Sequence, residues 1–304
     1  MNENHTNELI NTLTAIVNEV AQGDYRNAGT LFEFTKEDKY PPKIVTLAES
    51  FGMMIVQIDA KQQHLERLIN DLSVKKVELE QVASQLLRAN IGMLEVLGSA
   101  IAKRDSGTSA HNYRVTIHAI HLGKALGLNN AELCSLIKGS FLHDIGKIAI
   151  SDTILLKPGK LTFDEFEVMK THVLHGREII KNYDWLRDAG DVVLHHHEKF
   201  DGTGYPHGLK GDRIPLNARI FALADVFDAL TSKRPYKDPI PMDKTMEIMA
   251  ADAGSHFDPD LFRVFSEGDE EMYNSLACCS ESALTERLQI LMRDYYWVEL
   301  MQPK

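Results

Sequence analysis

The chain has 304 residues, of which 44% are hydrophobic and 25% are charged. This composition is ordinary for a globular protein and excludes disorder throughout. The 44 acidic residues outnumber the 33 basic ones, and this argues against general nucleic-acid binding, which needs a basic face. Three cysteines do not make a disulfide framework. No apolar run reaches the roughly 18 residues of a membrane helix and no leader pattern is apparent, so we expect a cytoplasmic protein.

Residues 1–22 are predicted to form a helix, because apolar residues recur at steps of three and four up to Gly23 and Asp24. Residues 24–43 are polar and are expected to be irregular. The order of helix, polar connector and second helix over residues 5–60 resembles a HAMP module, with a generic helical hairpin as the alternative. We therefore predict a helical HAMP-like signalling module over residues 1–57.

A heptad repeat begins at Ile44 and continues to Leu97. The second seam position contains three polar residues, Gln62, Lys76 and Asn90, which favour an in-register dimer over larger bundles. The sequence therefore predicts a parallel homodimer through residues 44–97, with a coiled-coil linker over 58–89. A long helix lying on its own domain is the alternative. The first seam position is filled by Ile44, Phe51, Ile58, Leu65, Leu72, Leu79, Leu86 and Met93.

The rest of the chain, residues 90–304, is predicted to be one almost entirely helical domain, since helical spacing recurs and no strand pattern is found. A further helix is expected to begin at Asp258 and Pro259, which suit a cap and a first turn. Four glycines and two prolines predict a loop over 198–215. Other helices are expected at 115–126, 130–142, 162–182, 218–230 and 243–251.

Five histidines and two aspartates in this domain form an ordered set of candidate metal ligands. Imidazole and carboxylate groups together suit divalent ions such as Fe, Mn or Zn. Seven ligands are too many for one ion and suit two ions that share a bridging carboxylate. The other histidines, including His195 and His207, are interpreted as supporting or surface residues. The seven candidates are His111, His143, Asp144, His172, His196, His197 and Asp225.

The motifs around these residues resemble an HD-GYP domain, a group of HD metal-dependent phosphohydrolases, over about residues 90–275. His143 and Asp144 open an HDxGK motif that ends at Gly146 and Lys147, and the segment 196–206 reads HHEKFDGTGYP. Further matches are Arg104-Asp105 before His111, Arg234-Pro235-Tyr236 after Asp225, and Gly254 with Phe257-Asp258-Pro259. The resemblance implies an all-α HD-domain helical bundle, here preceded by a long coiled-coil helix and a small helical N-terminal module.

The resemblance also implies an activity, the hydrolysis of cyclic di-GMP to linear pGpG, GMP or both. It implies that the seven candidates hold two divalent ions, Fe or Mn, with Asp144 as the bridge. Gly107 stands where some members carry a carboxylate for a third metal. Asp144 and Lys147 are the candidate catalytic residues, with Lys147 binding phosphate or protonating the leaving group. The candidate substrate-binding residues are Gly202, Tyr205, Arg234 and Lys237.

Two other functions remain open at this stage. One is a non-catalytic cyclic di-GMP receptor or protein-interaction scaffold, and the other is a phosphohydrolase for a different cyclic dinucleotide. The complete set of candidate ligands favours the enzyme over the receptor. Protein partners are predicted to bind through the N-terminal module or the loop that carries the GYP motif.

Overall fold

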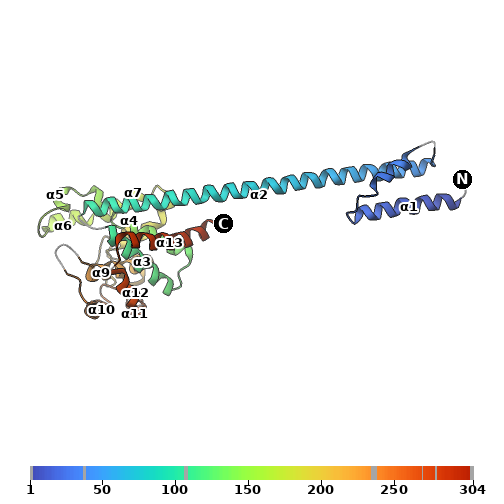
Figure 1. Cartoon of the computed structure of the whole chain (residues 1–304). Helices are drawn as coiled ribbons and strands as arrows, with labels where there is room; N and C mark the ends of the chain where they lie inside the picture. Colours follow the sequence, from blue (N-terminus) through green and yellow to red (C-terminus); the bar gives the residue numbers. More distant parts are fainter. Residues whose placement is uncertain are drawn as a thin grey trace. The chain divides into compact units, whose positions relative to one another are not determined.

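The computed structural model describes residues 3–36, 39–105, 109–233, 238–268, 270–277 and 279–301. All regular elements over these residues are helices, and this confirms the predicted all-α fold (Figure 1). Outside the helices, the described residues contain one isolated bridge, between Ala253 and Phe257. The chain divides into two compact units, Met1–Val82 and Ala83–Lys304. No helix in these ranges combines the length and apolar character needed to cross a membrane.

The first unit contains α1 (Glu3–Ala21), the 3-10 helix η1 (Ala28–Thr35) and the first part of α2 (Pro42–Arg104). The connector expected to be irregular therefore contains a helix. Its residues Leu31 and Phe34 are buried and pack with Leu13 and Ile16 of α1. This apolar contact gives η1 a reason to form, which the polar composition of the segment did not indicate.

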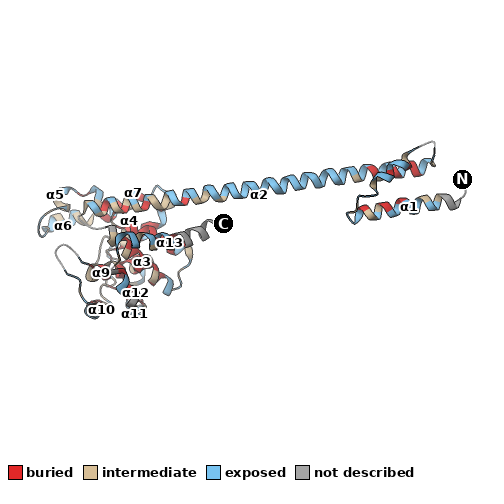
Figure 2. Ribbon diagram, in the orientation of Figure 1, coloured by how far each residue is buried: buried red, intermediate tan, exposed pale blue. Residues whose placement is uncertain are grey.

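Helix α2 is continuous over 63 residues, in agreement with the long helix predicted from the heptad repeat. Its seam residues Ile58, Leu65, Leu72, Leu79, Leu86 and Met93 are between 40% and 70% exposed in the single chain (Figure 2). Farther along, Leu87, Leu94 and Ile101 are buried in the core of the second unit. Helix α2 thus buries one face there and leaves another apolar face uncovered.

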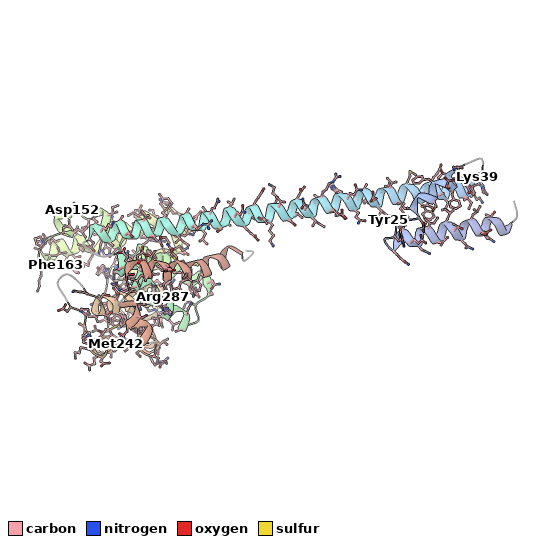
Figure 3. The ribbon with its side chains drawn as sticks, viewed as in Figure 1. Tyr25, Lys39, Asp152, Phe163, Met242 and Arg287 are labelled. Carbon is pink, nitrogen blue, oxygen red and sulfur yellow. The ribbon has the colours of Figure 1, made fainter. Side chains whose placement is uncertain are left out.

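The second unit is a bundle whose large core includes Ile117 and Ile120 of α3, Leu136 of α4, and Phe221 and Phe227 of α9. Figure 3 marks Asp152 and Phe163 at the starts of α5 and α6, and Met242 at the start of α10. The elements after α2 are α3 (Ser109–Ala125), α4 (Asn130–Leu142), η2 (Ile145–Ala149), α5 (Asp152–Leu155), α6 (Phe163–Lys170), α7 (His172–Ile180), η3 (Asp184–Ala189), α8 (Gly190–His195), η4 (Gly211–Arg213), α9 (Leu216–Thr231), α10 (Met242–Ala251), α11 (Pro259–Ser266), α12 (Glu270–Ala277) and α13 (Glu281–Met301).

Local sequence signals fix several of these helix ends. Asn129 and Glu132 form a reciprocal capping box at the start of α4. The predicted start of α11 is confirmed, because the Asp258 side chain accepts from two backbone N–H groups and Pro259 occupies the first turn. The helix expected over 162–182 is wrong as a single element. It breaks at Thr171, whose hydroxyl bonds the carbonyl of Val168, and α7 then starts at His172.

Candidate metal centre

The candidate histidines of the second unit stand at helix ends, where backbone carbonyls are free to orient them. His143 follows α4, His172 opens α7 and His196 follows α8. Their Nδ1 atoms lie 2.7 Å from Ser140 O, 2.8 Å from Met169 O and 3.0 Å from Val192 O, respectively. A carbonyl oxygen only accepts, so each Nδ1 donates its N–H to that oxygen and each Nε2 is the nitrogen that faces the cluster. This arrangement is typical of histidines that bind metal ions.

Three of these side chains meet closely enough to share an ion. The Nε2 atoms of His172 and His196 lie 3.4 Å apart, and one ligand atom from each of His172, His196 and His197 lies within 4.8 Å of the others. The ring of His143 is 5.3 Å from that of His196. Burial first, and then neighbouring imidazoles, hold the pKa of His196 well below its usual range and lower the pKa of His197 to about 4. Both rings are therefore neutral near pH 7, as metal ligands must be.

Asp144 lies between two of these histidines. Its Oδ2 is 3.1 Å from His143 Nε2, and its Oδ1 is 3.5 Å from His172 Nε2. Burial opposes its ionisation, but His143 and Lys147 outweigh this effect and bring the pKa of the carboxyl well below its ordinary value. An ionised carboxylate that faces two imidazoles is placed as the predicted bridging ligand would need to be.

His111 and Asp225 form the other side of the cluster. His111 Nε2 lies 3.3 Å from Asp225 Oδ1, and the His111 ring is 6.0 Å from the His143 ring. His111 Nδ1 lies 2.7 Å from Asp228, whose carboxylate also accepts from Arg114 and Ser232. Burial would lower the pKa of His111, but the two carboxylates outweigh burial and raise it to about 9. The carboxylates thus draw a positive charge to this position, and a bound cation would supply the same charge.

The donor set therefore fits divalent metal ions, with imidazole Nε2 atoms and carboxylate oxygens converging from α3, α7, α9 and the ends of α4 and α8. A cavity of about 40 Å³ is lined by Asp105, His111 and Asp144, among others. This volume exceeds the roughly 10–15 Å³ that one water molecule needs. Asp228 and Arg114 were not among the predicted site residues. The spacing of Asp225 and Asp228, three apart on α9, could have indicated that they share one face.

Lys147 of the HDxGK motif is held by two carboxylates. Its Nζ lies 2.8 Å from Asp144 Oδ2 and 2.5 Å from Asp105 Oδ2. Burial acts against the ammonium, yet both carboxylates outweigh it and raise the pKa of Lys147 above its ordinary value. Arg104, the last residue of α2, donates to the carbonyls of Lys147 at 2.6 Å and Ile150 at 2.7 Å. Arg104 and the adjacent Asp105 therefore hold the backbone and the side chain of this lysine, respectively.

Two motif glycines are required by close backbone approach. A Cβ on Gly146 would lie 1.8 Å from the carbonyl oxygen of His172, and a Cβ on Gly204 would lie 2.3 Å from the backbone nitrogen of Lys199. Any side chain would therefore push η2 away from α7 or open the GYP loop. Gly202 has a φ of 88°, which only glycine adopts freely, so its structural role is a turn. Its contact with substrate stays a prediction.

The GYP loop contacts the histidine cluster through Tyr205 and is held together internally by Glu198. The Tyr205 ring stacks on the His197 ring at 4.7 Å, and the Lys170 ammonium lies 5.7 Å from the centre of the Tyr205 ring. Glu198 is buried and accepts the backbone N–H groups of His207 at 2.8 Å and Leu209 at 3.0 Å. Arg234 and Lys237, the other predicted substrate contacts, lie outside the described residues, as does Gly107.

The helical bundle, the adjacent His143 and Asp144, and the converging histidines together define the class of protein. Residues 95–261 match the family model described as "HD domain". The chain belongs to the HD domain family. It is 47% identical over 168 residues to a cyclic di-GMP phosphodiesterase response regulator of Xanthomonas campestris pv. campestris, over 55% of this chain and 44% of that protein. It is 38% identical over 182 residues to a cyclic di-GMP phosphodiesterase of Thermotoga maritima, over 59% of this chain and 50% of that protein.

A third relative has a different named substrate. The chain is 35% identical over 254 residues to a 3'3'-cGAMP-specific phosphodiesterase of Vibrio cholerae, over 83% of this chain and 48% of that protein. The chain thus spans about half the length of these relatives or less. The resemblance to HD-GYP phosphodiesterases is confirmed, whereas the HAMP-like module over residues 1–57 stays a prediction.

Proposed function

We propose that the chain is a metal-dependent phosphodiesterase that hydrolyses a cyclic dinucleotide, with cyclic di-GMP as the first candidate and pGpG, GMP or both as products. The observation that carries this proposal is that ligand atoms of His172, His196 and His197 lie within 4.8 Å of one another, with the carboxylate of Asp144 3.5 Å from His172 Nε2. The named activities of the relatives agree with it, because two act on cyclic di-GMP and one on 3'3'-cGAMP.

Two divalent ions, Fe or Mn, are the proposed cofactors. Asp144 joins two sets of donors, one formed by His172, His196 and His197 and the other by His111, His143 and Asp225. When bound, such a pair of ions would supply an activated water and offset the negative charge of a phosphodiester. An acidic chain could accommodate an anionic substrate at this position for the same reason.

The ammonium of Lys147 is proposed to bind a phosphate oxygen of the substrate. Asp105 and Asp144 keep it charged and fixed in place, and its raised pKa makes it a poor donor of its proton near pH 7. We therefore assign Lys147 to charge stabilisation rather than to protonation of the leaving group. Tyr205, which stacks on His197, is proposed to form one wall for a nucleobase. Arg234 and Lys237 are proposed to contact phosphate oxygens, for which an Arg fork and a Lys point charge are suited.

The decisive experiment is hydrolysis of cyclic di-GMP and, in parallel, 3'3'-cGAMP, with products separated by chromatography. The protein is purified without oxygen, stripped with chelator and reloaded with Fe(II) or Mn(II). We expect metal-dependent turnover that is lost in His143→Ala and Asp144→Ala and kept in His175→Ala, an exposed histidine of α7. Binding without turnover under both metals would favour the receptor alternative. Preference for the mixed dinucleotide would replace cyclic di-GMP as the substrate.

We also propose a parallel homodimer through residues 44–97, because the exposed seam of α2 repeats every seven residues and fits a second copy of itself.

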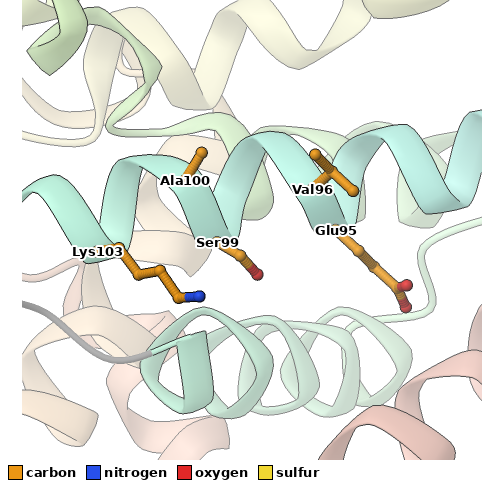
Figure 4. Close-up of a pocket in the computed structure, with 5 residues that line it drawn as sticks. All are labelled: Glu95, Val96, Ser99, Ala100 and Lys103. Carbon is orange, nitrogen blue, oxygen red and sulfur yellow. The ribbon is translucent and has the colours of Figure 1, made fainter.

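Apart from the seam, α2 also lines an open groove of about 380 Å³ with Glu95, Val96, Ser99, Ala100 and Lys103 (Figure 4). Val96 is 68% exposed there. Three further points stay predictions. They are the regulation of the second unit by the N-terminal residues, the binding of protein partners, and the domain boundaries 1–57, 58–89 and 90–304.

A further inference from the structure

A second group of metal-binding side chains lies beside the GYP loop, apart from the seven candidate ligands. It consists of His195, the last residue of α8, with Glu198 three residues later and His207 in the loop. One ligand atom from each of the three lies within 4.8 Å of the others. The rings of His195 and His207 are 5.5 Å apart, and His195 Nδ1 is 4.0 Å from Glu198 Oε1.

His195 leaves a buried nitrogen without a hydrogen-bond partner. Its Nδ1 atom has no partner among the described residues. At 4.0 Å, Glu198 is too distant to accept a hydrogen bond from it. Two donors that each stand about 2.0–2.1 Å from one ion are separated by roughly this distance or somewhat less.

Glu198 supplies a completely buried carboxylate whose oxygens still have lone pairs available for a metal ion. Its side chain is 0% exposed, and no Lys or Arg side chain in the described ranges forms an ion pair with it. Its two oxygens accept the N–H groups of His207 and Leu209, and each oxygen has a second lone pair. The bond to the His207 backbone also brings the His207 imidazole to the carboxylate.

We propose that His195, Glu198 and His207 form an additional site for a divalent d-block cation such as Zn(II) or Co(II). Two imidazoles and one carboxylate are a ligand set that such ions use, with a fourth position left for water. His207 is exposed, so the ion can enter from solvent. The site is separate from the candidate centre because it shares no side chain with it. It does not depend on the proposed activity.

A cation at this site would tie the end of α8 to the GYP loop. The segment between Glu198 and His207 includes Tyr205, which stacks on His197. Closing this segment at both ends with one ion would hold Tyr205 in that position. The inferred role is therefore to rigidify the loop beside the candidate metal centre.

The test compares His207→Ala with the parent chain and with His175→Ala, a matched change at an exposed histidine outside both clusters. Each chelator-stripped protein is dialysed to equilibrium against Co(II), and bound metal is counted. We expect His207→Ala to bind one equivalent less than the other two proteins. His143→Ala should keep the additional equivalent while losing turnover, so that failure of this inference and failure of the phosphodiesterase proposal are distinguishable.

A second readout follows the loop itself. Lys199 and Lys210 are exposed trypsin sites on either side of His207. Saturating Co(II) should slow cleavage at both sites in the parent chain and in His175→Ala, but not in His207→Ala. His207→Asp, which restores a ligand oxygen, should recover part of the protection. Equal metal counts and equal cleavage rates in the parent chain and His207→Ala would overturn the inference.

Discussion

The Nδ1 atom of His111 lies 2.7 Å from the carboxylate of Asp228, and these residues are 117 positions apart in the chain. Arg114, one turn after His111 on α3, holds the same carboxylate at 2.5 Å. Asp228 is 1% exposed, so this contact is shielded from water. The carboxylate therefore fixes which nitrogen of His111 faces Asp225, and it ties α3 to α9 at the candidate centre.

Asp228→Asn is expected to weaken metal binding without removing a proposed ligand. The loss of a supporting carboxylate typically lowers metal affinity or activity by about 10–100-fold, because the imidazole loses orientation and basicity. Equilibrium dialysis with Mn(II), together with turnover at saturating metal, measures both effects. Asp71→Asn, an exposed position on α2, is the control and should leave both unchanged. Unaltered metal affinity in Asp228→Asn would show that His111 does not depend on this bond.

Lys147→Met is expected to lower kcat by about 10²–10³-fold while metal content stays the same, because one preorganised charge facing the phosphate is lost. Asp105→Asn should lower kcat less, since Asp144 still holds the ammonium. Steady-state kinetics with metal analysis of each variant test this expectation. Lys160→Met changes an exposed lysine and should behave like the parent chain. A rise in KM alone would assign Lys147 to substrate binding only.

Acid should destabilise the metal-free protein through His118, a buried residue of α3 that is not a metal candidate. Burial lowers its pKa from 6.5 to about 4 in the folded state. The unfolded chain therefore binds the proton first, and the stabilisation present above pH 6.5 is lost as the pH falls toward 4. The loss is on the order of 3 kcal/mol.

Urea unfolding of chelated protein between these pH values measures this effect. His118→Leu should flatten the acid side of the stability curve, whereas His64→Leu, at an exposed position, should not. A parallel fall in the parent chain and in His118→Leu would assign the acid sensitivity to other groups.

Gly146→Ala is expected to destabilise the fold and disturb the centre, because the new Cβ would lie 1.8 Å from the backbone of His172. Overpacking of this kind costs about 1–3 kcal/mol or more when backbone must move. Gly92→Ala is the contrasting variant, since nothing lies within 4 Å of its Cβ position on α2. It should be neutral or stabilising by up to about 1 kcal/mol. Thermal unfolding with bound-metal analysis compares the two, and equal melting temperatures would refute the packing argument.

Leu72→Glu combined with Leu79→Glu is expected to convert a dimer into a monomer, because charges would replace two apolar residues of the α2 seam. Light scattering of the parent chain measures the mass. Ser73→Glu, exposed on α2 but off the seam, should leave the dimer intact. A monomeric parent chain would contradict the coiled-coil proposal.

Periodicity predicted the all-α fold and the long α2, because these features depend on local spacing along the chain. The ordered HD, HH and GYP motifs were sufficient to select seven residues that the structure brings together, although their role as ligands stays a prediction. The break at Thr171 was missed because a side-chain bond to a carbonyl leaves no mark in hydrophobic spacing. The role of Asp228 was missed because its partner His111 is on another helix.

The contacts of Arg104 and Asp105 have a mechanical consequence. Helix α2, which is proposed to join two copies of the chain, ends at Arg104. Arg104 donates to the carbonyl of Lys147, and the next residue, Asp105, accepts from the Lys147 ammonium. A shift of the last turn of α2 relative to η2 would have to break these contacts or carry Lys147 with it. The position of Lys147 beside Asp144 therefore depends on the C-terminal end of α2 as well as on the HDxGK motif itself.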